Sequence, residues 1–452
     1  MFTLMIVVFI IGYACIALEH PLHINKSATA LLLGTVMWLL FSLGDPASFP
    51  AFTDYQAYLQ SHPEASFMEW MTHIPLIEHL GEVAEILFFL MGAMTIVEIV
   101  DTHKGFRIIT DRIKTTKKSN LLWIISIITF FMSSVLDNLT TSIVMIALLR
   151  KLIGVKKDRW FFAGMVILAA NAGGAWSPIG DVTTIMLWIG GKVSSFHIIS
   201  TTFLASIVSM IVPLIILSFT MKGEIVRPKE EEETGQHIEI IKRQRVFMFF
   251  LGVGALIFVP IFKTITHLPP YLGMLGGLGV LWIVTGFMHR GRPEREIDRL
   301  SVNHILSKID VPSILFFLGI LMAVNALATC GQLALLSQSL DKIPLGEPSK
   351  YYLITAIIGV LSSVVDNVPL VAGAMGMYNF PIDHYFWAFL AYAAGTGGSI
   401  LIIGSAAGVA VMGMEKIDFI WYLKKISWLA LIGYLAGCAT YIVQEMLMGV
   451  AA

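Results

Sequence analysis

The sequence predicts an all-α polytopic membrane protein with two inverted repeats, about ten spanning segments, two re-entrant hairpins and two discontinuous helices. Of its 452 residues, 56% are hydrophobic and only 13% are charged, about half the charged share of a soluble domain. Several apolar runs reach the roughly 20 residues that a spanning helix needs. The segment Ser-Ser-Val-Leu-Asp-Asn at 133–138 returns almost unchanged at 362–367, inside a second apolar run.

Three apolar runs open the first repeat (1–221), at about 3–18, 27–43 and 83–100. Residues 44–82 carry six acids and no Lys or Arg, whereas basic residues gather at 104–118. Cytoplasmic loops carry an excess of Lys and Arg. The third run is therefore expected to cross from outside to inside, which places the N-terminus outside.

The interval 121–149 predicts a re-entrant hairpin. It is apolar, yet basic residues flank it on both sides, the second group at 150–159. Both of its ends are therefore expected in the cytoplasm. The polar break at its centre is tolerated at that depth only where protein or a water-filled cavity covers it.

Residues 161–190 predict a discontinuous helix, because Gly173, Gly174, Pro178 and Gly180 interrupt an apolar run and such residues do not continue a regular helix. A further run at 197–221 then returns to the cytoplasm. We expect the charged stretch 222–245, with an acidic run at 230–233, to be a solvated cytoplasmic linker between the repeats.

The second repeat (246–452) mirrors the first. Its expected elements are runs at about 246–262, 271–288 and 313–330, a hairpin at about 351–378, a broken helix at about 386–413 and a last helix at about 426–446. The basic loop at 290–308 is expected inside, so the run that follows crosses outward, opposite to its partner at 83–100. The repeats are therefore predicted to be inverted, and both termini to lie outside.

Inverted repeats with broken helices near mid-membrane are typical of secondary transporters, and the sequence has no nucleotide-binding P-loop signature. The breaks contain almost only oxygen donors and no Lys or Arg. The candidate site residues are Asp137, Asn138, Thr140, Thr141, Asn171, Ser177, Asp181, Thr183, Thr184, Ser362, Ser363, Asp366, Asn367, Thr396, Ser399 and Ser405. Such donors favour a small hard cation, although half-helix N-termini can bind an anion instead.

The acids predict how transport is coupled. An aspartate in hydrocarbon costs roughly 2.5–3.5 kcal/mol on insertion scales, and a desolvated carboxylate can hold a proton near neutral pH. A site that binds either Na⁺ or H⁺ would exchange one for the other, with Na⁺ at Asp137, Asn138, Asp181, Asp366 and Asn367. Two alternatives stay open: aspartates that only pair with helix ends or polar side chains, and a cation channel.

Other residues give weaker signals. Glu82, Glu85, Glu98 and Asp101 are candidates for a proton path or for interface-facing acids, and His103 is expected in a solvated loop. The three cysteines, at 15, 330 and 438, have no ligand-like spacing. We also expect no cofactor, no enzymatic activity and no nucleic-acid partner.

The segment Ser-Ser-Val-Leu-Asp-Asn-Leu-Thr-Thr-Ser at 133–142 resembles the signature of NhaD-type sodium/proton antiporters of the ion transporter superfamily, as do 171–184 and 362–367. The resemblance covers nearly the whole chain. It implies export of Na⁺ and Li⁺ in exchange for H⁺, typically at alkaline pH, across a bacterial cytoplasmic (inner) membrane. It also implies a homodimer with a scaffold and an elevator-like moving part. The residues it marks as functional are Asp137, Asn138, Asn171, Asp181, Thr183, Thr184, Ser362, Asp366 and Asn367.

Relatives that carry dicarboxylates or arsenite share this architecture, but their hairpin tips tend to be neutral, unlike Asp137 and Asp366 here. The second repeat also has Pro369-Leu370 in place of the paired threonines, and Ser405 where the first has Asp181. The resemblance therefore implies an asymmetric site dominated by the first repeat.

The hairpin orientation gives a first test. In a background without the native cysteines, Lys117→Cys and Lys157→Cys are both expected to react with an impermeant thiol reagent from the cytoplasmic side only. Labelling from opposite faces would contradict the hairpin and, with it, the inverted repeat.

Overall fold

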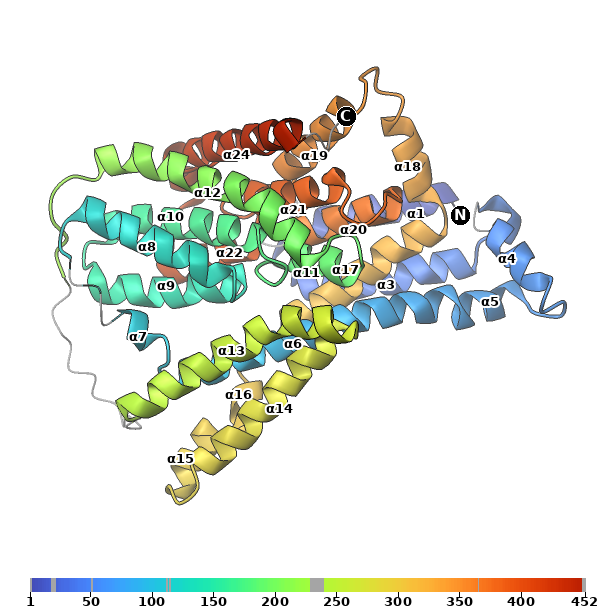
Figure 1. The fold of residues 1–452 in the computed structure, drawn as a ribbon. Coiled ribbons are helices and arrows are strands. Elements are labelled where there is room, and N and C mark those ends of the chain that lie inside the picture. Colours follow the sequence, from blue (N-terminus) through green and yellow to red (C-terminus); the bar gives the residue numbers. More distant parts are fainter. Residues whose placement is uncertain are drawn as a thin grey trace. The chain divides into compact units, whose positions relative to one another are not determined.

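The computed structural model describes residues 2–17, 22–49, 52–110, 113, 115–227, 240–364 and 366–448, and within these ranges it contains helices and no strand (Figure 1). In chain order the elements are α1 (Phe2–Ala17), α3 (Lys26–Ser42), η1 (Pro46–Ser48), α4 (Phe52–Leu59), α5 (Phe67–His73), α6 (Pro75–Thr102), α7 (Arg107–Thr110), α8 (Lys118–Ser133), α9 (Asn138–Leu152), α10 (Lys156–Ala175), α11 (Val182–Ile189), α12 (Ser195–Thr220), α13 (Lys242–Thr266), α14 (Pro270–Met288), α15 (Glu294–Leu300), α16 (Val302–Leu306), α17 (Val311–Thr329), α18 (Gln332–Leu340), α19 (Ser349–Leu361), α20 (Asn367–Met377), α21 (Tyr385–Gly397), α22 (Ala406–Glu415), α23 (Phe419–Lys425) and α24 (Ser427–Met448).

The predicted interruptions fall where the helices break. The first hairpin becomes α8 and α9, and the first discontinuous helix becomes α10 and α11. In the second half the corresponding pairs are α19 with α20 and α21 with α22. The largest boundary difference is α6, which begins at Pro75, well before the expected start near 83. Its first two turns are formed by residues assigned from the sequence to the outer loop.

Six spans within the described residues are long and apolar enough to cross a membrane: 67–102 and helices α12, α13, α14, α17 and α24. Helices α1 and α3 are slightly shorter, at 16 and 17 residues. These lengths agree with a polytopic membrane protein, in which a helix needs about 17–25 residues to span. The count of ten spans and the inverted relation between the halves stay predictions.

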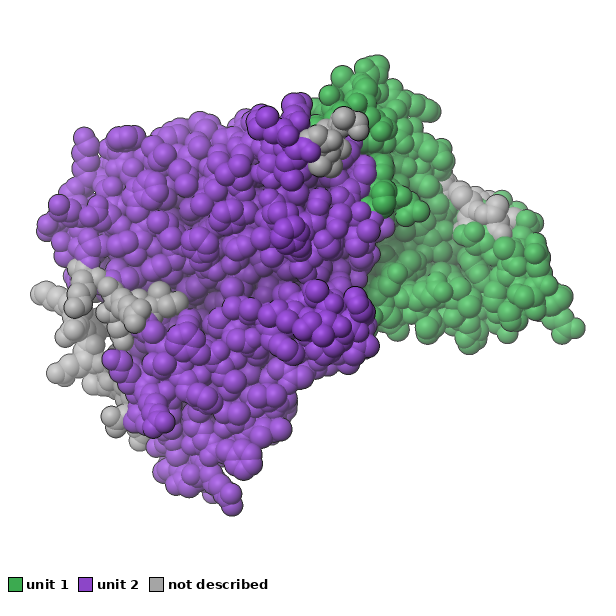
Figure 2. Space-filling view, viewed as in Figure 1, with its two compact units in different colours: residues 1–88, 310–354, 368–381 green, residues 89–309, 355–367, 382–452 purple. Residues whose placement is uncertain are grey.

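Two compact units divide the chain differently from the two predicted repeats (Figure 2). Unit 1 comprises residues 1–88, 310–354 and 368–381, and unit 2 comprises 89–309, 355–367 and 382–452. Each unit therefore takes segments from both halves of the sequence.

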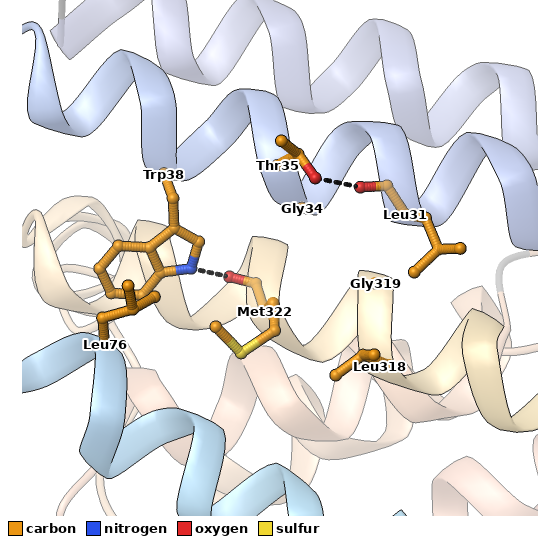
Figure 3. A pocket seen from close by; sticks show the side chains of 8 residues that line it. All are labelled: Leu31, Gly34, Thr35, Trp38, Leu76, Leu318, Gly319 and Met322. Carbon is orange, nitrogen blue, oxygen red and sulfur yellow. Dashed lines mark hydrogen bonds between the residues drawn. The ribbon is translucent and has the colours of Figure 1, made fainter. Parts of the chain in front are cut away.

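Unit 1 contains a close crossing of α3 and α17. A methyl group added to Gly34 would lie 2.6 Å from the carbonyl oxygen of Gly319, so both glycines are required for this approach. Trp38 Nε1 donates to the carbonyl oxygen of Met322 at 2.9 Å, and beside this contact the two helices and Leu76 line an apolar cavity of about 310 Å³ (Figure 3). The crossing thus combines backbone contact with a side-chain hydrogen bond.

Unit 2 has the first arms of the two broken helices at its centre. Every residue of α10 from Phe162 to Ala175 is buried, as is every residue of α21. Helix α10 packs against α8, α9, α12, α21 and α22, several of which lie alongside it in Figure 1. A helix that is apolar all round is expected inside a bundle, and the arrangement brings the C-terminal breaks of α10 and α21 into the interior.

The start of the predicted linker is hydrogen bonded. Ile225 N donates to the carbonyl oxygen of Thr116 at 2.8 Å, and Gly154 N donates to that of Val226 at 2.7 Å. The Ile225 side chain is buried. These contacts hold residues 223–226 against the base of the first hairpin, while the acidic run at 230–233 lies outside the described residues.

Candidate ion-binding site

Asp137 lies at the tip of the first hairpin and caps α9. Its Oδ1 accepts a hydrogen bond from Thr140 N at 2.7 Å, and its Oδ2 accepts one from Thr140 Oγ1 at 2.6 Å. Capping satisfies one of the free amide groups that every helix N-terminus has. An ionised carboxylate has about four lone-pair sites, so two acceptor positions of Asp137 remain for another partner.

Asn171, on α10, joins three elements that are distant in the sequence. Its Oδ1 accepts from Asn138 Nδ2 at 3.0 Å. Its Nδ2 donates to Ser399 Oγ at 2.8 Å and to Ser405 Oγ at 3.0 Å. All four side chains are buried. The tip of the first hairpin and the breaks of both discontinuous helices therefore meet at one amide.

Asp181 caps α11 from a buried position. Its Oδ1 accepts from Thr183 N at 3.4 Å, and Thr184 Oγ1 donates to its backbone carbonyl at 2.8 Å. Its Oδ2 has no hydrogen-bond partner among the described residues, although the residue is only 1% exposed. A methyl group on Gly395 would lie 3.0 Å from this oxygen, so the absence of a side chain there makes room for it.

Three carboxylates share this region, because the charges of Asp366 and Asp137 both act on Asp181. The hydroxyls of Thr141 and Thr183 are also buried without a hydrogen-bond partner in the described part of the chain. Buried polar atoms nearly always have partners, and each exception needs an explanation such as an ion or a functional role. The unpaired atoms of Asp181, Thr141 and Thr183 are oxygens, which suit a hard cation, whereas the unpaired Nε1 of Trp176 in the same break is a hydrogen-bond donor.

The two halves repeat several contacts. Ser133 Oγ donates to the carbonyl oxygen of Ala170 at 2.6 Å, and Ser362 Oγ donates to that of Ala394 at 2.7 Å. Asp181 and Ser405 cap the second arms of the two broken helices. Each serine joins a hairpin to a broken helix, so the local architecture is the same in both halves. The capping side chain differs, because the first half has a carboxylate at this position and the second half has a hydroxyl.

The side chains of some predicted site residues form only local hydrogen bonds within the described residues. Ser177 Oγ accepts from Ile179 N at 3.3 Å, Ser363 Oγ donates to the carbonyl oxygen of Val360 at 2.7 Å, and Thr396 Oγ1 donates to that of Tyr392 at 2.6 Å. Hydroxyls in helices commonly bond the backbone in this way. Ion binding stays a prediction for every candidate site residue, including these three, Asp366, which is half-buried, and Asn367, which is buried.

Sequence reasoning missed one group beside the site. Tyr422 is fully buried, and its hydroxyl donates to the carbonyl oxygen of Ser399 at 2.9 Å. It holds the backbone next to a serine that contacts Asn171. No pattern marks Tyr422 in the sequence, because it lies in α23, between the broken helix and the last apolar run.

The interpretation of His103 as a solvated loop residue is wrong. His103 is fully buried just past the end of α6, and its Nε2 lies 2.7 Å from Nε2 of His289, just past the end of α14. Nδ1 of His103 lies 2.6 Å from the carbonyl oxygen of Ile99. Burial lowers the pKa of both imidazoles, that of His289 to about 4, and nearby Arg292 acts in the same direction. Both rings are therefore neutral near pH 7.

Helices that break at buried polar clusters, in a chain with long apolar spans, define the class of secondary transporters. Residues 6–397 match the family described as citrate transporter. Sodium/proton antiporter 1 of Arabidopsis thaliana is 48% identical over 97% of this chain and 72% of its own length, and sodium/proton antiporter 2 of that plant is 44% identical over 97% and 98%. The Na(+)/H(+) antiporter NhaD of Vibrio cholerae is 30% identical over 93% of this chain and 87% of its own. The chain therefore belongs to the NhaD-type sodium/proton antiporters within the citrate transporter family, which confirms the resemblance in its motifs.

Asn171→Ala is expected to lower the thermal stability of the purified protein. The change leaves Asn138 Nδ2 and two serine hydroxyls without their partner, and an unsatisfied buried polar group costs about 1–3 kcal/mol. The unfolding temperature in detergent measures the effect. The control is Asn120→Ala on the exposed start of α8, expected to change stability by no more than about 0.5 kcal/mol. Equal unfolding temperatures for the two variants would contradict a central role for the amide.

Proposed function

We propose that this protein exports Na⁺, and also Li⁺, in exchange for H⁺, with one carboxylate site that binds cation and proton alternately. The observation that carries the proposal is the buried Oδ2 of Asp181, which has no hydrogen-bond partner among the described residues. The charges of two further aspartates, Asp137 and Asp366, act on this carboxylate. The antiporter names of the relatives support the same activity.

The physical reason is charge. The buried Asp181 is repelled by the charges of the half-buried Asp137 and Asp366, and burying a carboxylate without a partner is costly. Either a proton or a metal ion relieves both penalties. Na⁺ would be held by Asp137 and Asp181, with the hydroxyls of Thr141 and Thr183 as neutral ligands, and Asp366 would add charge from the second half. A proton on the same carboxylates would remove the charge that holds the ion, so the two ligands compete.

Anion transport is the second candidate, because the matching family is described as citrate transporter. The N-termini of α9, α11 and α22 meet at the site through their capping residues, and helix N-termini favour anions. Here, however, two of the three caps are themselves carboxylates. They occupy the positions that a citrate carboxylate would need, so we favour the cation. A cation channel would conduct Na⁺ without moving protons.

We also propose the membrane topology and the oligomeric state of the transporter. The repeated serine contacts support two repeats, and the charge distribution along the sequence supports their inverted orientation in a bacterial cytoplasmic membrane, with both termini outside. Family resemblance supports a role in pH homeostasis and a homodimer. The mass of the detergent-purified protein, against 49.9 kDa for one chain, checks the dimer.

Proteoliposomes with an imposed proton gradient test the exchange. For wild type, Na⁺ is expected to dissipate the gradient. The half-saturating Na⁺ concentration should rise about tenfold per unit fall in pH where one proton competes with one Na⁺. Asp137→Asn and Asp181→Asn should abolish exchange, because amides keep the size and lose the titratable charge, and Asp366→Asn should reduce it.

Asp298→Asn, a change in an exposed loop helix, is the control and should behave as wild type. Half-saturation that does not depend on pH would exclude the shared site even if Na⁺ were transported. Na⁺ flux without proton movement would favour the channel, and citrate uptake without any Na⁺ response would favour the anion transporter.

An elevator-like movement predicts that the first hairpin tip becomes accessible from both sides. In the cysteine-free protein, Leu136→Cys should react with impermeant thiol reagents from the cytoplasm under one gradient direction and from outside under the other. The Leu136 side chain is buried in this structure, so reaction of the cysteine reports a conformational change that exposes the hairpin tip. Reaction from a single face under all conditions would favour a rigid site with small gates.

A further inference from the structure

A second polar cluster, Arg150, Arg159 and Glu415, lies at the opposite ends of the helices that carry the site. Glu415 Oε1 accepts from Arg150 Nε at 2.7 Å, and Glu415 Oε2 accepts from Arg159 Nε at 2.7 Å. The Glu415 side chain is fully buried, whereas that of Arg150 is 45% exposed. Each carboxylate oxygen thus has its own cationic donor.

Further hydrogen bonds fix the backbone around this cluster. Arg150 Nη2 also donates to the carbonyl oxygen of Met414, and Arg159 Nη1 donates to that of Ile153 at 2.9 Å. Trp160 Nε1 donates to the carbonyl oxygen of Glu415 itself at 3.1 Å. The last turn of α22 is therefore held by side chains of α9 and α10, through both its carboxylate and its terminal carbonyl groups.

The cluster and the candidate site lie at the two ends of the same three helices. Twelve residues separate Asn138 from Arg150 on α9 and Arg159 from Asn171 on α10. Ten separate Ser405 from Glu415 on α22. At about 1.5 Å per residue, the two sets of contacts are about 15–18 Å apart along each helix. Since α9 and α22 start at the site and end at the cluster, they run parallel, and α10 runs in the opposite direction.

We propose that Arg150, Arg159 and Glu415 are positioning residues for the cation site. Among the described residues, α22 is hydrogen bonded to α10 at the site through the Ser405 hydroxyl, and one such bond does not by itself fix the register of a helix. The two ion pairs set its register against α9 and α10 at the other end. They thereby determine how closely the break before α22 approaches the carboxylates of Asp137 and Asp181.

The competing interpretation is that the cluster only stabilises the fold. A buried ion pair is weak support for stability, because desolvation offsets much of the attraction. Loss of stability alone would leave the ion affinity of the folded molecules unchanged. Mutations in contact networks that reach a distant binding site typically change the coupling to that site roughly 2- to 30-fold. Na⁺ affinity therefore separates the two interpretations.

The inference rests on the proposed exchange, and its test is Glu415→Gln measured beside wild type in the same proteoliposomes. We expect the half-saturating Na⁺ concentration to rise roughly 2- to 30-fold, with a smaller change in the maximal rate. The rise in unfolding temperature on adding Na⁺ gives a second measurement that needs no transport, and it should require correspondingly more Na⁺. If Glu415→Gln does not fold, Arg150→Gln replaces it, because Arg159 still neutralises the carboxylate.

Lys118→Gln is the matched control. Lys118 Nζ and Asp158 Oδ2 form an ion pair of 2.8 Å between α8 and α10, at the same end of the bundle but without α22. This variant should keep the wild-type Na⁺ dependence. A wild type without any Na⁺ response would overturn both the exchange and the positioning role. A wild type that responds, with Glu415→Gln or Arg150→Gln responding at the same concentration, would overturn the positioning role alone.

Discussion

The side-chain amide of Asn171 has two donor hydrogens and one carbonyl oxygen, and contacts within the described residues use all three groups. Its partners come from the first hairpin and from the second broken helix. In an apolar interior no water replaces a lost partner, so such an amide holds its neighbours to within hydrogen-bond distance. The arrangement of the site depends on this junction, because the backbones that carry Asp137, Asp181 and Ser405 all converge on it.

A break in a helix within the membrane interior leaves backbone N–H and C=O groups that need other hydrogen-bond partners. Here the breaks supply them locally, since Asp137, Asp181 and Ser405 each cap the helix that follows. The side-chain atoms left without a hydrogen-bond partner in the described part of the chain include oxygens of Asp181, Thr141 and Thr183. The same breaks that satisfy the backbone therefore leave a cluster of acceptors that a cation or proton can complete.

Membership in a family described as citrate transporter, together with relatives named sodium/proton antiporters, shows how little the fold constrains the cargo. Hairpins and broken helices create a buried polar cluster with helix N-termini around it, and such a cluster suits either sign of charge. The side chains at the caps decide between them. In this chain two of the caps are carboxylates, so the N-termini of α9 and α11 already have a negative charge beside them.

From the sequence alone, composition determined the membrane class, because 13% charged residues cannot cover a soluble surface of this size. Local chemistry determined the breaks, since Gly, Pro, Asp and Asn interrupt helices wherever they cluster, and the repeated Asp-Asn motif identified the family. Only the tertiary structure decided which polar residues meet. Asn171 and Ser405, or Arg150 and Glu415, are more than 200 residues apart, and no local preference encodes such a pairing. Burial was also decided only by packing. His103 follows a basic-loop pattern in the sequence, yet in the folded chain it is buried against His289. The access of His103 to water depends on the residues at the end of α14 that pack on it and not on its own segment.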